Sequence, residues 1–211
     1  MEEWFKGIDG NQVKRGNMCG RYIYNDKATT EIQRYLELEG SYTYNDTVIT
    51  PAMNAVSLVK DKKLSENIAI TSLFWGIVGY DKKLIINAKS ESVADKTLFA
   101  DSFMARRCIL PAVGFYEWDK AKTKYEFKRE DTGSIYLAGL YDLSDNKDSF
   151  VILTTSANES MKPVHDRMPV IIDKKDVKEY LLDTSSALNL IKQPMPQLVK
   201  SSEYEQLSLF D

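Results

Sequence analysis

The sequence of 211 residues has few of the residues that build disulfides and metal sites. It contains two cysteines, Cys19 and Cys108, and one histidine, His165. The cysteines form no CxxC pair, so a disulfide framework and a structural zinc site are both disfavoured. We therefore expect no metal and no cofactor, and a reducing compartment.

Long hydrophobic segments and a large net charge are also missing. No apolar run approaches the roughly 18 residues needed to span a bilayer. The first residues, MEEWFKGIDGNQVKRGN, include no apolar stretch of signal-peptide length. The formal net charge is −3, so binding to DNA would need a local basic patch rather than a global positive field. We expect a cytoplasmic monomer that does not associate with membranes.

The sequence does have the composition of one globular domain, with 43% hydrophobic and 28% charged residues. Apolar periodicity predicts helices over 27–40, 95–107, 173–184 and 185–193. Many short runs rich in β-branched and aromatic residues lie between them, including 68–78 and 107–118. Helices and strands do not alternate regularly, which disfavours a doubly wound parallel sheet. We predict a single α+β domain of curved, mostly antiparallel, barrel-like sheets with peripheral helices.

Two residues, His165 and Glu117, lie in sequence contexts that are common for catalytic residues. His165 lies in KPVHDRMPVII, a polar turn that enters an apolar strand, although a lone histidine is more often a structural hydrogen bonder. Glu117 lies in GFYEW, where alternation puts it on the same side as Phe115. The ordinary interpretation is a solvent-facing glutamate. An aromatic side would instead desolvate the carboxylate and raise its pKa, which suits acid–base catalysis.

The stretch INAKSES places Asn87, Lys89 and Glu91 two residues apart after an apolar strand. If the extended geometry persists, all three side chains project to one face. They form either an ordinary solvated edge or an orienting amide with a phosphate contact.

The two cysteines have different neighbours. Cys108 follows Arg106 and Arg107, which supply local positive charge, and we expect its thiol to be buried in a strand and inert. Cys19 follows Met18 in what looks like a second start. Within a chain it is one more small apolar residue suited to burial. With a free α-amine it becomes a 1,2-aminothiol, which condenses with an aldehyde to an imine and then, through sulfur, to a thiazolidine.

Five segments in this order, MCGRY, FWGIV, INAKSES, RRCILPAVGFYEW and HDRMPVII, resemble the SOS-response-associated peptidase (SRAP) family. The resemblance runs from about Met18 to the strand after His165 and is weaker beyond it. It implies an SRAP-like fold over residues 19–211. It also implies a protein that recognises abasic sites in single-stranded DNA, crosslinks to them through an N-terminal cysteine, and exposes that cysteine by autoproteolysis.

Four residues match the family's reacting groups. The resemblance makes Cys19 the crosslinking nucleophile and Asn87 the amide that holds the terminal amine and the sugar. It makes Glu117 the acid–base carboxylate and His165 the group that protonates the sugar during ring opening.

Further residues match positions that contact DNA. Arg21, Trp75, Arg106 and Arg107 fall where the family contacts phosphates or stacks near the lesion, and Phe115 would brace a neighbouring base with Trp75. Lys89 departs from the family's usual arginine, since it keeps the charge but loses the bidentate fork. Val113 departs from the usual acidic residue before Gly114-Phe115.

Two routes would free Cys19, because residues 1–18 are either a propeptide cleaved after Met18 or a leader that is not translated. We favour the second, since Lys14-Arg15-Gly16-Asn17 can be encoded by purine-rich codons resembling a ribosome-binding site. Two other functions remain open. One is a cysteine autopeptidase or hydrolase unrelated to DNA, and the other is a noncatalytic module that binds single-stranded DNA.

Overall fold

The computed structural model describes residues 19–39, 45–61, 67–79, 81–131, 133–143 and 147–202. The predicted leader, residues 1–18, lies outside the described residues. The helices are α1 (Asp26–Tyr35), α2 (Ala100–Ala105), α3 (Val177–Leu182) and α4 (Thr184–Leu190). The strands are β1 (Arg21–Tyr24), β2 (Thr47–Ile49), β3 (Asn54–Lys60), β4 (Ile68–Trp75), β5 (Ile77–Val78), β6 (Leu84–Ile85), β7 (Asn87–Lys89), β8 (Arg107–Ala112), β9 (Gly114–Trp118), β10 (Lys124–Arg129), β11 (Ile135–Asp142), β12 (Ser149–Ser156), β13 (Arg167–Pro169), β14 (Ile171–Ile172) and β15 (Leu198–Ser202).

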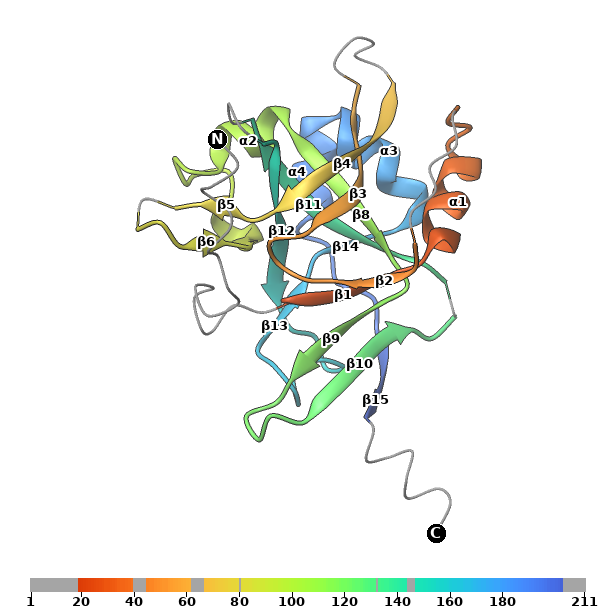
Figure 1. The fold of residues 1–211 in the computed structure, drawn as a ribbon, viewed down its shortest axis with the longest axis vertical. Coiled ribbons are helices and arrows are strands. Elements are labelled where there is room, and N and C mark those ends of the chain that lie inside the picture. The colour runs from red at the N-terminus through yellow and green to blue at the C-terminus, as the bar shows by residue number, and fades with distance from the viewer. Residues whose placement is uncertain are drawn as a thin grey trace.

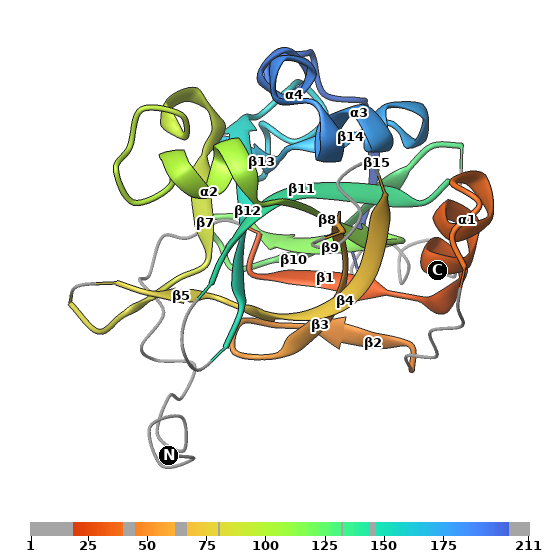
Figure 2. The ribbon, with the colours of Figure 1, turned by 90° about the horizontal axis from the view of Figure 1, so that it is seen from above.

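A closed ring of strands forms the centre of the fold (Figure 2). β3 pairs with β4 and β8, β8 with β11, β11 with β12, and β12 with β4. The β12–β4 pairing is parallel and the other pairings in the ring are antiparallel. The prediction of a curved, mostly antiparallel α+β architecture is confirmed.

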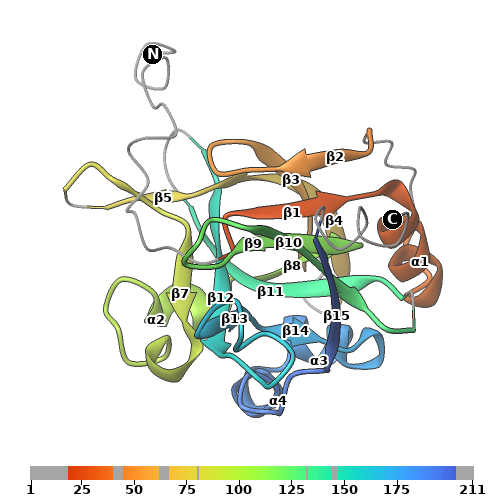
Figure 3. The same ribbon diagram turned by 90° about the horizontal axis from the view of Figure 1, so that it is seen from below.

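A second sheet, in the order β15-β10-β9-β1-β2, is antiparallel throughout (Figure 3). Its inward side chains include Tyr22, Phe115 and Phe127, which are all fully buried. The Tyr22 ring lies 5.4 Å from the Trp75 ring of β4, centroid to centroid, so aromatic packing joins this sheet to the barrel. This second sheet carries Glu117 on β9, and Cys19 lies just before its strand β1.

Two predicted strands are each divided between different sheets. The run 107–118 breaks at Val113, so that β8 belongs to the barrel and β9 to the second sheet. The run 68–78 breaks at Gly76, whose φ of +123° disfavours any other residue. A Cβ at Gly76 would also lie 2.4 Å from Leu84 Cγ. Apolar content alone does not reveal these breaks.

The helices are shorter than predicted and lie at the end opposite β9, β10 and β15 (Figure 1). The predicted helix over 95–107 forms only as α2, and the helix predicted over 27–40 is regular only to Tyr35. Within the described ranges, no helix is both long and apolar enough to cross a bilayer.

Candidate active site

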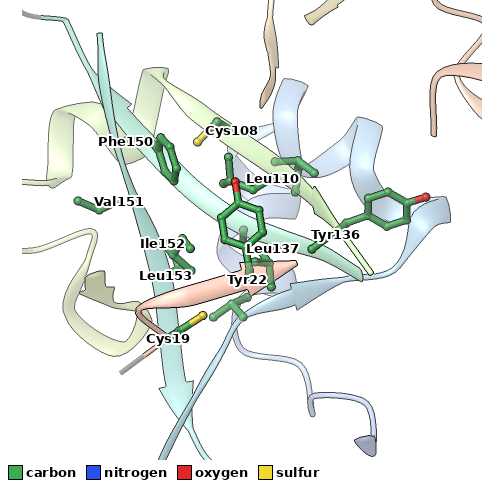
Figure 4. Packing of buried hydrophobic residues seen from close by; sticks show 14 of the residues in the cluster. Cys19, Tyr22, Cys108, Leu110, Tyr136, Leu137, Phe150, Val151, Ile152 and Leu153 are labelled. Atoms are coloured by element: carbon green, nitrogen blue, oxygen red, sulfur yellow. The ribbon is translucent and has the colours of Figure 1, made fainter. Parts of the chain in front are cut away.

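Pairing of β1 with β9 brings Cys19 to Glu117. The register sets Arg21 opposite Tyr116, and Cys19 lies two residues before Arg21. The backbone N–H of Cys19 donates to Glu117 Oε2 over 3.1 Å, and both residues are buried. Cys19 has a φ of +51°, a left-handed conformation that is uncommon for a residue with a side chain. Cys19 lies just before β1, and its side chain belongs to the main hydrophobic core (Figure 4).

Burial determines the ionisation of Glu117. Loss of hydration raises the pKa of this carboxyl to about 7, while the hydrogen bond from Cys19 acts in the opposite direction. This confirms the prediction that desolvation raises the pKa of Glu117. A carboxyl of this kind accepts or gives up a proton near neutral pH, as a general acid–base group must.

The Cys19 thiol differs from the sequence-based expectation of a readily available nucleophile. Burial, and secondarily the charge of Glu117, raise the pKa of this thiol well above its ordinary value. The thiol is therefore protonated at neutral pH, and a base must remove its proton before it attacks. The thiol of Cys108 is also buried with a raised pKa, as expected for an inert cysteine.

His165 faces Glu117 from the turn before β13. Its Nε2 lies 3.9 Å from Glu117 Oε1, and its Nδ1 accepts the backbone N–H of Arg167 over 3.1 Å. Asp166 Oδ1 also lies 2.9 Å from Nδ1, and the two contacts suit different charge states. Neutral imidazole accepts from Arg167 and carries its proton on Nε2, towards Glu117. Imidazolium donates from Nδ1 to Asp166 instead.

Asn87 contributes an unpaired amide. It begins β7, which runs parallel to β12 with Asn87 opposite Ile152. Its Oδ1 and Nδ2 are both buried, and neither has a hydrogen-bond partner among the described residues. Gly20, next to Cys19, lies close to Ile86, the residue before Asn87. A buried amide left unpaired is costly, so this one is suited to a ligand or a chain terminus.

The predicted common face of Asn87, Lys89 and Glu91 is only partly present. The extended geometry ends at Lys89, which is exposed, and Glu91 lies in the 3₁₀ turn Ser90–Ser92. Glu91 is instead paired with Arg167, whose Nη2 donates to its Oε2 over 2.8 Å. The role of Arg167 was missed in the sequence, although it stands two residues after His165 in HDRMP.

Three of the predicted DNA contacts are corrected by burial. Trp75 is fully buried and donates its indole N–H to the carbonyl of Ile86 over 3.0 Å, so it supports the segment before Asn87. Phe115 is fully buried and stacks on Phe127 at 5.3 Å. Neither ring is open to a base in this structure.

The third correction concerns Arg107. Its guanidinium is buried and donates to the backbone carbonyls of Tyr180 over 2.6 Å and Phe103 over 2.7 Å, which ties α2 to α3. Arg106 stays partly exposed, but its Nη2 pairs with Asp142 at 3.3 Å. Both arginines thus have structural partners rather than a free guanidinium for phosphate.

The outer side of the second sheet carries rings and cations beside the site. Arg21 is exposed, with its guanidinium 5.1 Å from the centroid of Trp118. Lys124 Nζ lies 5.2 Å from the centroid of Tyr116. We call Arg21, Tyr116, Trp118 and Lys124 the outer face. Side chains alternate along the strand GFYEW, so Tyr116 and Trp118 project to the side opposite Phe115 and Glu117. The sequence could therefore have revealed these two rings.

An open hollow of about 730 Å³ adjoins this face, and its lining includes Trp118, His165 and Asp166. His165 therefore connects the hollow to the buried Cys19–Glu117 pair. Within the described ranges, no group of three or more His, Cys, Asp or Glu is placed to hold a metal ion.

A buried thiol, a carboxyl with a raised pKa, an imidazole and an unpaired amide are the kinds of group that a nucleophilic reaction with acid–base assistance requires. Residues 18–208 match the family model described as SOS response associated peptidase (SRAP), and the chain belongs to this family.

Several similar proteins carry names that describe the processing of abasic sites. "Abasic site processing protein YoqW" of Bacillus subtilis is 31% identical over 185 residues, covering 78% of this chain and 80% of the relative. "Abasic site processing protein YoaM" of the same species is 32% identical over 187 residues, covering 78% and 79%. "Abasic site processing protein YedK" of Escherichia coli is 27% identical over 179 residues, also covering 78% and 79%.

Solved structures share the fold. A crystal structure of a Bordetella bronchiseptica protein has a TM-score of 0.72 at 20% identity, covering 87% of this chain and 99% of that one. A phage-related protein of the same species has a TM-score of 0.71 at 21% identity, covering 87% and 93%.

Proposed function

We propose that this protein processes abasic sites in single-stranded DNA by forming a thiazolidine with them through Cys19. The observation that carries the proposal is the 3.1 Å contact between the Cys19 backbone nitrogen and Glu117 Oε2. The amide nitrogen in this contact stands in for the α-amine of a chain that begins at Cys19. An acid–base carboxyl therefore adjoins the atom that must attack and later lose protons.

The reaction balances as aldehyde plus aminothiol giving thiazolidine plus water. The α-amine of Cys19 adds to C1′ of the ring-opened sugar, and Glu117 protonates the departing hydroxyl to leave an imine. The thiol proton passes to Glu117, and sulfur adds to the imine carbon while nitrogen recovers a proton. The raised pKa of the thiol makes this base necessary.

In this proposal, His165 and Asn87 act on the sugar of the abasic site. The Nε2 of His165 lies on the Glu117 side of the imidazole, where it can donate a proton to the ring oxygen as the closed sugar opens. The unpaired amide of Asn87 would orient the terminal amine or the sugar hydroxyl, because both of its polar atoms are free of partners among the described residues.

The outer face supplies the contacts to DNA in this proposal. Its rings offer stacking surfaces, each contributing on the order of 1–3 kcal/mol per base, and its cations face phosphates. The positive charge here is local, because the whole chain has a net charge of −3.

Charge on the outer face is expected to control noncovalent binding. In the double variant Arg21→Gln, Lys124→Gln, affinity for undamaged single-stranded DNA should fall about tenfold at moderate salt. The slope of log affinity against log salt should become shallower by about 1.4, at about 0.7 per lost phosphate contact. Fluorescence anisotropy over a salt series measures both. The control is Lys178→Gln on the exposed side of α3. An unchanged slope would remove this face from the DNA path.

Asp166 is expected to stabilise the protonated ring of His165. Asp166→Asn removes the partner of the imidazolium but leaves the Arg167 N–H contact to the neutral ring. Crosslinking should slow about threefold, a small effect because the exposed carboxylate is partly screened by solvent. Single-turnover crosslinking rates, with the exposed Asp101→Asn as control, measure the effect. Equal rates for Asp166→Asn and wild type would count against this pairing.

Exposure of Cys19 stays a prediction, with the two routes given above. The decisive comparison uses one protein that begins at Cys19 and one that retains residues 1–18, each verified by intact mass. Both are incubated with single-stranded DNA that contains one abasic site. Only the first should give a heat-stable, SDS-resistant adduct. Salt-sensitive binding without an adduct would favour the noncatalytic module. Absence of any DNA interaction would favour a peptidase or hydrolase.

A further inference from the structure

β12 lies between two parts of the candidate site. On one edge it pairs with β13, which begins at Arg167, and on the other with β7, which begins at Asn87 (Figure 3). His165 lies two residues before Arg167. The position of His165 relative to Asn87 therefore depends on how β13 and β7 are held across β12.

The side chain of Arg167 connects these strands. Its Nη2 donates to the backbone carbonyl of Thr154 in β12 over 2.6 Å and to Oε2 of Glu91 over 2.8 Å, while its Nη1 donates to Oε1 of the same glutamate. Glu91 belongs to the 3₁₀ turn Ser90–Ser92 that directly follows β7. An arginine that holds both oxygens of a carboxylate fixes the orientation of the pair as well as its distance. One guanidinium thus ties β13 to β12 and to the end of β7.

The backbone of Arg167 orients the imidazole of His165. Its N–H donates to Nδ1 over 3.1 Å, so the neutral ring carries its proton on Nε2, which lies 3.9 Å from Glu117 Oε1. β13 has only three residues, and Arg167 is the first of them, where strand pairing frays most readily. The side-chain contacts of Arg167 are therefore needed to keep this N–H in place against the ring.

We propose that Glu91 is a positioning residue, which holds the imidazole of His165, through Arg167, with its proton directed towards Glu117. Without the Glu91 carboxylate, the guanidinium keeps only its contacts to Thr154 among the described residues, although the Arg167 side chain is just 17% exposed. A largely buried charge that loses its partner is strongly destabilised and turns towards other groups, which shifts the N–H that holds the ring. The catalytic consequence rests on the proposed function, whereas the orientation of the ring does not.

The orientation can be measured directly, because His165 is the only histidine in the sequence. The full chain, labelled with ¹⁵N and free of any histidine tag, is studied by NMR at alkaline pH, at which imidazole is neutral. In wild type the two ring nitrogens should have widely separated shifts, with the proton on Nε2. In Glu91→Gln the separation should become smaller, because a displaced Arg167 N–H no longer selects one tautomer.

The matched control is Asp142→Asn. Asp142 is the carboxylate partner of another partly exposed arginine, Arg106, and its side chain is as exposed as that of Glu91, at 46% for each. This variant loses an ion pair of the same kind at a distance from His165. Its histidine nitrogens should therefore have the wild-type shifts.

The catalytic consequence is measured on the same variants in chains that begin at Cys19. At saturating abasic single-stranded DNA, Glu91→Gln should crosslink about tenfold more slowly than wild type, because small misplacements of a reacting group are costly. The DNA concentration at half-saturation should not rise. In a His165→Ala background the same substitution should change the rate by less than about twofold, since the group that Glu91 positions is gone.

Each result decides the inference. Wild-type nitrogen shifts in Glu91→Gln overturn it, as does a wild-type ring that carries its proton on Nδ1. An additive loss of rate in the His165→Ala background, or equal effects of Asp142→Asn, would mean that Glu91 acts on the fold in general. A wild-type chain that forms no adduct would remove the proposed function, and a smaller nitrogen separation in Glu91→Gln would still establish that Glu91 positions His165.

Discussion

A chain that begins at residue 19 and carries Cys19→Ser is expected to lose its heat-stable DNA adduct. The serine variant keeps the α-amine, so it still forms an imine with the opened sugar. Oxygen closes the ring far less effectively than sulfur, and the imine hydrolyses on heating. The yield of heat-stable adduct should fall by at least about 100-fold. Denaturing gels of the reaction with abasic single-stranded DNA measure this yield.

Chemical reduction separates the two nucleophiles of Cys19. Borohydride converts an imine to a stable amine, so the reduced Cys19→Ser sample should recover a covalent adduct close to the wild-type amount. The control is Cys108→Ala, because Cys108 is the other buried thiol and should not affect the adduct. A heat-stable adduct in Cys19→Ser without reduction would show that sulfur is dispensable, which contradicts the thiazolidine.

The second large effect is expected at Glu117. Glu117→Gln keeps the size and the capacity to accept the Cys19 N–H, but the amide cannot carry a proton between substrate and thiol. Crosslinking should slow by about 100- to 10,000-fold, the range typical of a general acid–base group. Noncovalent DNA binding should persist, because the outer face is unchanged. Rates are measured under single-turnover conditions, with the exposed Glu179→Gln on α3 as control. Wild-type rates in Glu117→Gln would remove this carboxyl from the mechanism.

The same variant should abolish the contribution of this site to the pH dependence of stability. The pKa of Glu117 in the folded chain is about 7, above the value near 4.5 of an unperturbed glutamate. Its folded-state protonation therefore stabilises the protein fully below pH 4.5, and this contribution is lost as pH rises through 7. Glu117→Gln lacks that loss, so its stability relative to wild type should increase between pH 4.5 and 7. The gain is at most about 3 kcal/mol.

Denaturant unfolding at pH 5 and pH 8 checks the sign. The difference in unfolding free energy between Glu117→Gln and wild type should be larger at pH 8. A difference that shrinks towards alkaline pH would mean that the carboxylate is stabilised, not penalised, by its surroundings.

Alternation in the sequence was informative where a strand has one buried side. It placed Phe115 and Glu117 together and predicted the raised pKa that burial gives the carboxyl. The same alternation places Tyr116 and Trp118 on the opposite side of the strand, so it would also have predicted the rings of the outer face. Composition and the absence of βα alternation were enough to predict the α+β class.

Long-range partners could not be predicted in the same way. Arg107 looked like a phosphate ligand, yet carbonyls more than seventy residues away occupy its guanidinium. Trp75 looked like a stacking ring, yet its indole supports the segment before Asn87. The strand break at Val113 depends on two sheets meeting, which no local pattern encodes.

The left-handed backbone of Cys19 has a consequence for the proposed exposure of its amine. A φ of +51° costs a residue with a side chain about 1–3 kcal/mol. This angle is defined only when a peptide bond precedes the residue. In the proposed chain that begins at Cys19, the constraint on this angle and the strain that comes with it would therefore be absent.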